Sequence, residues 1–420
     1  MMSSRIPPVV VALATTTWES SLIAALTHPS SSVVVVRRCL DVADLLATAA
    51  SGVARVAVVS PGLARFDGNA VAQLHASGVA VIACVDREVD AESARLRAMG
   101  VDDVVSVQED FAALFASIDA HCDTQPDGST ARTPSPEVGA ARATGSLVAV
   151  WGPIGSPGRT SVAVGIADEV ARAGVESLVI DADVYASSIA QSLGIVDDAP
   201  GIAAACRRAD SGTLDAGALA ALCVQVRRGP RLLTGLPRAD RWMELRPSGL
   251  VRLWEVARAL SPLVVVDCGF ALDHHEDVLF DTWAPRRNAA TLTALENADV
   301  VVAVGGGEPV GIARLVRGVL DLRDAVPDAE IRVVVTRIRA EPIGAKPERQ
   351  IRAALARHAG IEDIVCIPDD RFAHDRAARD GRTLAEVMPR SPARLAVQAF
   401  ALGLASQLPT AASSARSLSA

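Results

Sequence analysis

One stretch of the chain, residues 147–161 with the sequence LVAVWGPIGSPGRTS, constrains its fold more than any other. Leu147–Trp151 is a short apolar run, which predicts a buried strand. Residues 152–158 are rich in glycine and proline and predict a loop, and Thr160–Ala173 has apolar residues at helical spacing. A strand, a glycine-rich loop, a basic residue, a hydroxyl and a helix, in this order, form the layout of a phosphate-binding loop. Such a loop binds because backbone N–H groups and a helix N-terminus face one anion.

The loop departs from the usual pattern, G-x-x-x-x-G-K-[ST]. Gly158, Arg159 and Thr160 align with its last three residues, while Pro153 stands where the first glycine is expected. Pro153 and Pro157 have no N–H, and each therefore removes one potential phosphate donor. Arg159 keeps the positive charge of the lysine as a wider, planar fork. We expect a nucleotide-site loop with weakened binding or hydrolysis; the alternative is an ordinary strand–turn–helix connection.

Acidic residues follow two further predicted strands. Leu178–Asp181 is followed two residues later by Asp183, and Leu263–Asp267 reads LVVVD. Because ligands of open α/β folds collect at the carboxyl edge of the parallel strands, we expect these carboxylates to lie beside the phosphate loop. There they would serve a magnesium ion or an attacking water. Capping of a helix N-terminus by Asp183 is the alternative.

The bulk composition limits the classes of protein that fit. A length of 420 residues suggests about two or three domains, and a formal net charge of −8 argues against a general nucleic-acid binder. The seven cysteines form no C-x-x-C pair, which favours a reducing, cytoplasmic compartment. The N-terminus lacks a basic region before a long apolar stretch, and no apolar run approaches about 18 residues. We therefore expect neither a secretion signal nor a membrane-spanning helix.

Residues 1–120 predict a doubly wound α/β domain with a parallel sheet, because five strand-like runs alternate with helix-like runs. The predicted strands are Val9–Ala14, Val33–Arg37, Val56–Ser60, Val79–Val85 and Asp103–Val107. Their order is similar to that of a response-regulator receiver domain, which has a flavodoxin-like fold. Phe66-Asp67-Gly68 lies where receivers often carry a similar tripeptide.

The groups that a receiver uses for its chemistry are missing from this region. Thr15, Thr16 and Thr17 stand where an acidic pair is expected, and Ser60 stands where the phospho-accepting aspartate is expected. The lysine at the end of the fifth strand is replaced in the region of Ser106. Without these groups we expect no magnesium site and no acyl-phosphate nucleophile. We predict a pseudo-receiver domain that docks or dimerises; a plain α/β packing domain without a partner is the alternative.

The rest of the chain divides into three segments. Residues 121–145 are rich in Pro, Ser, Thr, Gly and Ala without periodicity, which predicts a flexible linker. Residues 146–408 predict a larger α/β domain with a mostly parallel sheet. Its terminal amphipathic segment, Arg394–Leu408, predicts a helix that packs on the core. Residues 409–420 predict a polar, disordered tail.

Residues 146–408 resemble the MinD/ParA group of P-loop ATPases, and more narrowly its CpaE/TadZ-like branch, with a degenerate Walker A motif. The resemblance rests on the loop 152–161 and on four further runs: IDADVYASSIAQSLG (180–194), VVVDCG (264–269), NAATLTALENADVVVAV (288–304) and the ending IPDDRFAHDRAARDGRTLAEVMPRSPARLAVQAFA (367–401). That branch joins an inert receiver-like domain to a MinD-like domain and acts in Tad pilus assembly or in septum-site placement.

The resemblance implies roles for the site residues. It makes Asp183 the switch I acid, with Asp181 as its neighbour, and Asp267 the Walker B acid. Asp183 and Asp267 would be catalytic, and together with Thr160 they would hold Mg²⁺. The phosphates of ATP would contact Gly152, Gly155, Ser156, Gly158, Arg159, Thr160 and Ser161.

Two departures from the family pattern bear on catalysis. Members of the group carry a second, signature lysine in K-G-G-x-G-K-[ST], which reaches across a nucleotide-sandwich dimer. Here Ile154 stands at that position and Ser156 replaces the second glycine of the pair, so both lysines are absent. Because such cations stabilise the charge of the γ-phosphate in the transition state, we expect weak or no hydrolysis. Arg286 or Arg287 is a candidate substitute; a solvated helix start is the alternative.

Two functions stay open from the sequence. The first is a nucleotide-dependent spatial regulator, in which ATP closes a homodimer that recruits septation or Tad pilus and secretion proteins. The second is a non-catalytic scaffold with a dead nucleotide site, so whether the chain is an ATPase also stays open. The acidic balance and the lack of a basic helix disfavour specific nucleic-acid binding. In both cases we expect a cytoplasmic protein that reaches the inner face of the membrane only through its partners.

Overall fold

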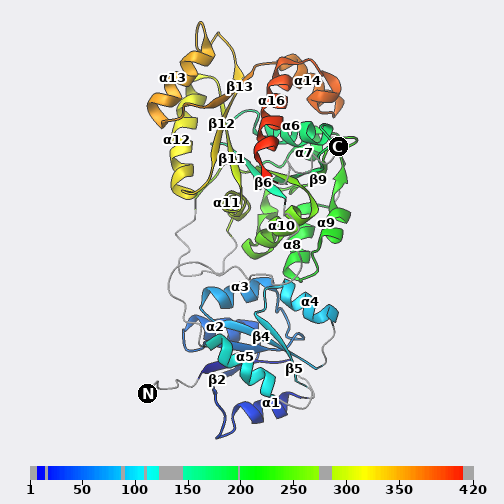
Figure 1. Cartoon of the computed structure of the whole chain (residues 1–420), viewed down its shortest axis with the longest axis vertical. Coiled ribbons are helices and arrows are strands. Elements are labelled where there is room, and N and C mark those ends of the chain that lie inside the picture. Colours follow the sequence, from blue (N-terminus) through cyan, green and yellow to red (C-terminus); the bar gives the residue numbers. More distant parts are fainter. Residues whose placement is uncertain are drawn as a thin grey trace. The chain divides into compact units, whose positions relative to one another are not determined.

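The computed structural model describes residues 7–14, 18–86, 90–107, 111–122, 145–196, 199–273 and 286–409. The chain divides into two compact units, the first built mainly from residues 1–139 and the second mainly from residues 140–420. Each unit contains its own sheet covered by helices, blue to cyan in the first unit and turquoise to red in the second (Figure 1). The predictions for Thr15–Thr17, for most of the linker and for the tail lie outside the described residues.

The first unit has a five-stranded, all-parallel sheet in the order β2-β1-β3-β4-β5. This strand order confirms the predicted flavodoxin-like, doubly wound fold. The strands are β1 (Pro8–Ala12), β2 (Val34–Cys39), β3 (Val56–Val59), β4 (Ala80–Val85) and β5 (Asp103–Ser106). The helices are α1 (Glu19–Leu26), α2 (Val42–Ala50), α3 (Gly68–Ala76), α4 (Asp90–Ala98) and α5 (Ala112–Cys122).

Helices cover both faces of this sheet, which explains why its central strands are continuous runs of valine and alanine. Successive side chains of β1 point to opposite faces. Val9 and Val11 join a buried cluster with α1 and α5, and Val10 and Ala12 join one with α2 and α3. The first unit therefore has one core on each side of its sheet.

Two polar side chains of the first unit serve its backbone. Ser60, buried just after β3, accepts a hydrogen bond from the Ala14 N–H at 2.6 Å. Asp67, in the receiver-like tripeptide, accepts one from the Ala70 N–H at 2.9 Å and caps the N-terminus of α3. Ser60 thus links the segment after β1 to the end of β3.

The second unit has an eight-stranded sheet in the order β13-β12-β11-β6-β10-β7-β9-β8. All its strand pairs are parallel except β8 with β9. The strands are β6 (Ser146–Trp151), β7 (Ser177–Ala182), β8 (Val224–Gln225), β9 (Arg231–Leu233), β10 (Leu263–Cys268), β11 (Val300–Gly306), β12 (Ile331–Ile338) and β13 (Ile364–Pro368). The helices are α6 (Arg159–Arg172), α7 (Ile189–Ser192), α8 (Gly201–Asp210), α9 (Ala216–Leu222), α10 (Pro247–Leu260), α11 (Ala289–Glu296), α12 (Pro309–Ala325), α13 (Pro347–Ala359), α14 (Arg371–Asp380), α15 (Leu384–Val387) and α16 (Pro392–Gln407), with a 3₁₀ turn at Ala239–Glu244.

The sheet order brings the predicted loop and acids to one edge. β10 lies between β6, which leads into the loop, and β7, which leads to Asp183. Asp267 of β10 pairs with Val150 of β6 on one side and with Asp181 of β7 on the other. The carboxyl ends of the three strands therefore meet, as the parallel arrangement predicts.

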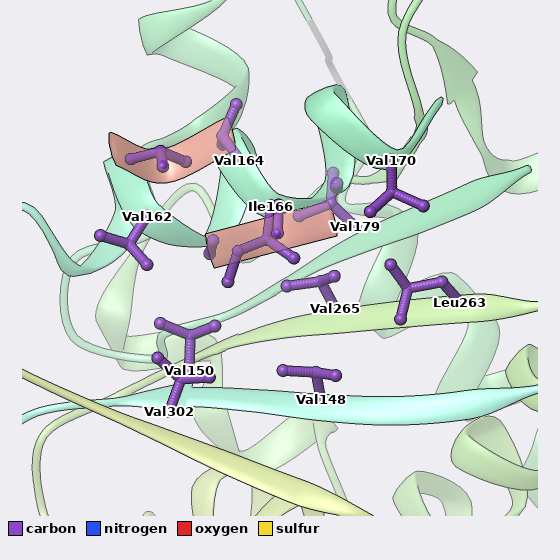
Figure 2. Packing of buried hydrophobic residues seen from close by; sticks show 14 of the residues in the cluster. Val148, Val150, Val162, Val164, Ile166, Val170, Val179, Leu263, Val265 and Val302 are labelled. Atoms are coloured by element: carbon purple, nitrogen blue, oxygen red, sulfur yellow. The ribbon is translucent and has the colours of Figure 1, made fainter. Parts of the chain in front are cut away.

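Helix α6 covers the centre of this sheet. Val162, Ile166 and Val170 on one side of the helix belong to the same buried cluster as Val150 and Val265 of the strands (Figure 2). Their spacing is that of one face of an α-helix, so burial of this face fixes the rotation of α6 about its axis. The N-terminus of α6 is thereby held beside the end of β6.

The terminal helix α16 packs closely on α6. A Cβ on Gly165 of α6 would lie 2.7 Å from Cγ1 of Val397, so a side chain at Gly165 would force the helices apart. Val397, Ala401 and Leu404 belong to the same core as α6, which confirms the predicted packing of the amphipathic segment. None of the described helices is long and apolar enough to cross a membrane.

Candidate functional site

The loop between β6 and α6 turns at two glycines. Gly155 has a φ of 75° and Gly158 a φ of 84°, in the left-handed region that glycine enters readily. A Cβ on Gly152 would lie 2.4 Å from the carbonyl oxygen of Val304, so this position also requires glycine. Helix α6 then begins at Arg159 without any side chain that caps it. Its first N–H groups have no intrahelical acceptors and are therefore open to an anion.

The two prolines anchor the loop to neighbouring elements. A Cβ on Gly318 of α12 would lie 3.0 Å from Cβ of Pro153, so α12 packs directly on this proline. The Pro153 carbonyl accepts a hydrogen bond from the Ser156 N–H at 3.1 Å, which engages that N–H within the loop. The Pro157 carbonyl accepts one from the Thr336 hydroxyl of β12 at 2.6 Å. The loop is thus held from two sides without using the first N–H groups of α6.

Asp181 fixes the turn that follows β7. Its Oδ2 accepts hydrogen bonds from the Ser187 hydroxyl at 2.8 Å and from the N–H groups of Ser188 and Ile189 at 3.0 Å each. These bonds hold the start of α7, as an N-cap would. Burial raises the pKa of Asp181, and the nearby Asp183 carboxylate acts in the same direction. Asp181 is therefore a residue that positions the turn, while Asp183 is the one that faces the loop.

Asp183 divides its two oxygens between the backbone and a cation. Its Oδ1 accepts hydrogen bonds from the N–H groups of Tyr185 at 2.9 Å and Ala186 at 3.2 Å. Its Oδ2 forms an ion pair and hydrogen bond with Nη2 of Arg159. The side chain of Asp183 is 3% exposed, so this contact is shielded from water.

Arg159 also faces Asp267. Nε of Arg159 lies 3.5 Å from Oδ1 of Asp267, and neither atom has a hydrogen-bond partner among the described residues. The Arg159 side chain is 13% exposed and that of Asp267 is 1% exposed. Burial raises the pKa of Asp267 to about 7, although the charge of Arg159 and a hydrogen bond from Thr160 lower it. The structure thus brings Thr160, Asp183 and Asp267 together as predicted, with the Arg159 guanidinium between the two acids.

A magnesium ion needs oxygen ligands in near-octahedral geometry. The predicted donors are oxygens, but both oxygens of Asp183 are engaged and the guanidinium of Arg159 faces Asp267. No group of three or more His, Cys, Asp or Glu side chains that could hold a metal ion occurs in the part of the chain that the structure describes. The donor set is that of a magnesium site, yet it does not fit the ion while Arg159 lies between the acids.

The two arginines proposed as substitute cations lie in different surroundings. The Arg287 guanidinium lies over the Tyr185 ring, 4.3 Å from its centroid, and the Tyr185 hydroxyl donates a hydrogen bond to Asn288 at 2.7 Å. Arg286 is exposed, and its carbonyl accepts the Ala289 N–H at the start of α11. Arg286 therefore fits the solvated helix start, whereas Arg287 packs on Tyr185 in the turn that follows Asp183.

Arg314 of α12 is a cation that the sequence reasoning missed. Its Nη1 would lie 2.5 Å from a Cβ on Gly155, so the guanidinium lies against the phosphate loop. No ion-pair partner of Arg314 is found within the described ranges, and its side chain is exposed. A signal was present in the sequence, because Arg314 lies in the helical segment that follows Gly305-Gly306-Gly307. The strand order places β11 beside β6, so this helix lies near the loop.

No family model matches the chain, and no curated protein matches it. Solved structures do resemble it. A ParA family ATPase from Chlorobium tepidum TLS matches with a TM-score of 0.51 and 16% identity, over 61% of this chain and 98% of that one. The cell division ATPase MinD of Pyrococcus furiosus matches with a TM-score of 0.47 and 15% identity, over 62% and 98%. The septum site-determining protein MinD of Pyrococcus horikoshii OT3, complexed with Mg-ADP, matches with 0.48 and 15%, over 62% and 95%. At these identities the first likeness shows the fold: the larger part of this chain is folded like a ParA family ATPase.

Proposed function

We propose that the second unit is a nucleotide-binding spatial regulator of the MinD/ParA type, which binds ATP and hydrolyses it weakly or not at all. The observation that carries the proposal is the loop after β6, where left-handed Gly155 and Gly158 lead into the uncapped N-terminus of α6. Backbone N–H groups and a helix N-terminus in this arrangement bind phosphate. The ParA-like fold of this part of the chain supports the same ligand class.

Weak hydrolysis follows from the cations of the site. Ile154 stands at the position of the signature lysine and is 59% exposed, so it offers an apolar side chain to a partner instead of a charge. Arg159 replaces the Walker A lysine and is bound to Asp183 and Asp267. Loss of a cation that stabilises a phosphoryl transition state lowers the rate by several orders of magnitude.

The cellular role is proposed from the sequence resemblance. Residues 146–408 would form the MinD/ParA-like domain of a CpaE/TadZ-like protein that positions septation machinery or Tad pilus and secretion machinery. ATP would close a homodimer, and residues 1–120 would act as a pseudo-receiver that docks or dimerises, joined through the linker 121–145. The protein would be cytoplasmic and would reach the inner face of the membrane through its partners.

A second function, a scaffold with a dead nucleotide site, is favoured by one observation. Arg159 faces both acids of the site, so the chain itself supplies the counter-charge that these two carboxylates need. In that case the ParA-like fold would serve only to present surfaces to partners. Binding measurements separate the two functions.

The proposal is tested by titrating the full chain with ATP and ADP in a calorimeter. Gly158→Ala introduces a side chain at a φ of 84°, with its Cβ 3.3 Å from Thr336, and we expect it to weaken binding by at least about tenfold. Gly360→Ala is the matched control, because Gly360 has a φ of 64° and nothing within 4 Å of its added Cβ, at the end of α13. We expect it to bind as the wild type does.

Phosphate release is measured beside binding. We expect the wild type to release phosphate no faster than Asp267→Ala, since the wild type already lacks both lysines. Release well above that of Asp267→Ala would show a true ATPase. Absence of nucleotide binding to the wild type, with and without magnesium, would leave the scaffold as the function.

A further inference from the structure

Arg159 occupies an unusual place for the basic residue of a phosphate loop. The motif that the loop resembles uses this residue to reach the β- and γ-phosphates. Here the side chain starts at the first residue of α6 and turns back to the acids at the ends of β7 and β10. It pairs with Oδ2 of Asp183, and its Nε lies 3.5 Å from Oδ1 of Asp267.

The charges of this cluster explain why a cation is needed there. The side chains of Asp183 and Asp267 are 3% and 1% exposed, so water does not screen their mutual repulsion. A guanidinium stays charged at any ordinary pH and is planar, which lets one side chain face two carboxylates. Neutralising and joining two acids beside a phosphate loop is otherwise the task of a bound Mg²⁺ ion.

We propose that the Arg159 guanidinium takes the place of a divalent metal ion in this site, so that a phosphate ligand binds at the loop without Mg²⁺. The inference rests on the proposed nucleotide binding. Asp183 supplies Oδ1 to the turn, and its Oδ2, which faces the site, is paired with the Arg159 guanidinium where a metal ion would otherwise bind. The phosphates would find positive charge in the first N–H groups of α6 and in Arg314, which lies against Gly155.

The first experiment compares ADP binding in the presence of Mg²⁺ and of EDTA. For the wild type we expect dissociation constants that differ by less than about twofold. Arg159→Gln keeps a polar, though shorter, side chain and removes the charge, so the two acids would repel the phosphates and attract a metal. For this variant we expect EDTA to weaken ADP binding by at least about tenfold.

The second experiment measures metal binding directly. Binding of Mn²⁺ is measured by electron paramagnetic resonance on the full chain, with and without ADP. We expect no site-bound Mn²⁺ in the wild type and a bound ion in Arg159→Gln that disappears when Asp267→Asn is added. Arg394→Gln is the matched control, because Arg394 is 14% exposed and pairs with the buried Glu169 on the same helix α6, outside the loop. It should lose stability without gaining a metal.

Each outcome has one meaning for the proposal. Site-bound Mn²⁺ in the wild type that depends on Asp267 would overturn the inference, as would an Arg159→Gln variant that gains no metal. Wild-type ADP binding that requires Mg²⁺ would also overturn it, while the proposed nucleotide-binding function would stand. Absence of ADP binding under both conditions would reject the proposed function, and the Mn²⁺ result would still decide whether Arg159 replaces the metal.

Discussion

The two units pair the buried polar side chains at the carboxyl ends of their parallel strands in different ways. In the first unit the buried residue after β3 is Ser60, a neutral side chain whose oxygen accepts a hydrogen bond from the Ala14 N–H. In the second unit Asp183 and Asp267 bring two buried carboxylates to the edge, and Arg159 faces both. The same type of strand end is closed by a hydrogen bond in one unit and by a counter-charge in the other.

This difference shows what acidic strand ends require. A buried neutral side chain at a strand end can pair with a neighbouring backbone group, and each such hydrogen bond stabilises the fold by a net of about 1 kcal/mol. Two buried carboxylates require a cation, whether it comes from solution or from the chain. The second unit carries two buried acids at this edge and supplies its own cation, whereas the first unit carries a serine at the end of β3.

The largest expected effect is that of Arg159→Ala on the second unit. Removal of one partner from a buried ion pair leaves the other charge uncompensated, and we expect a loss of about 3–5 kcal/mol in the free energy of unfolding. Hydrogen exchange of peptides from β6 and β10 measures this loss, and peptides from β1 and β3 serve as the internal control. The double variant Arg159→Ala/Asp267→Asn should recover part of it. A loss below about 1 kcal/mol would show that the guanidinium does not complete this edge.

Asp181→Ala comes next, with an expected loss of about 3 kcal/mol. The change leaves the Ser187 hydroxyl and the N–H groups of Ser188 and Ile189 without their acceptor, and buried unsatisfied donors are costly. Asp181→Asn keeps one acceptor oxygen and should lose less. The same exchange measurement on peptides from β7 and α7 compares the two variants. Equal losses would mean that the charge of Asp181, and not its hydrogen bonds, holds the turn.

The sequence predicted both sheets and the meeting of the loop with the acids, and the reason is physical. Strand and helix periods are local properties of the chain, and parallel strands place their carboxyl ends at one edge. Together with the loop motif, these two rules predicted that Asp183 and Asp267 lie beside the loop that leads to Thr160. The divergence between Asp181 and Asp183 did not follow, because spacing cannot tell which of two neighbouring acids accepts backbone hydrogen bonds.

The direction of the Arg159 side chain and the position of Arg314 depend on tertiary contacts and could not be predicted from the sequence. The motif assigns the residue at 159 to phosphate, and only the positions of both acids show that a guanidinium fits between them. Arg314 reaches Gly155 because β11 neighbours β6 although the two strands are far apart in the chain. Arg287 was a candidate substitute for the missing lysines, but the structure places its guanidinium over the Tyr185 ring.

Ser60→Ala tests the neutral edge in the first unit. The variant leaves the Ala14 N–H without its acceptor at a buried position, and we expect a loss of about 1–2 kcal/mol. Hydrogen exchange of peptides from β1 and β3 should show the loss, while peptides from β6 and β10 stay unchanged. A loss as large as that of Arg159→Ala would remove the energetic contrast between the two edges.

The smallest expected effect concerns Asp102, a partly buried acid at the start of β5 in the first unit. Asp102 precedes β5, and its Oδ2 accepts hydrogen bonds from His75 Nε2 and from the Val81 N–H at 2.7 Å each. Burial would raise the pKa of Asp102, but the hydrogen bond and charge of His75 and the bond from Val81 lower it below its ordinary value. Because the folded pKa lies below the unfolded one, the stabilisation is complete above about pH 4 and is lost as the pH falls through the folded pKa.

Asp102→Asn should therefore lower the stability of the first unit near neutral pH by only about 0.5–1 kcal/mol, since both partners of the pair are partly exposed. The wild type should lose this advantage in acid, so the two curves of unfolding free energy against pH converge below about pH 4. Peptides from β4 and β5 measure the effect by hydrogen exchange after equilibration at each pH. His75→Gln should show a smaller pH dependence than the wild type, because it keeps only the bond from Val81. Curves that stay parallel down to the lowest pH would mean that Asp102 stabilises the first unit through its shape and not its charge.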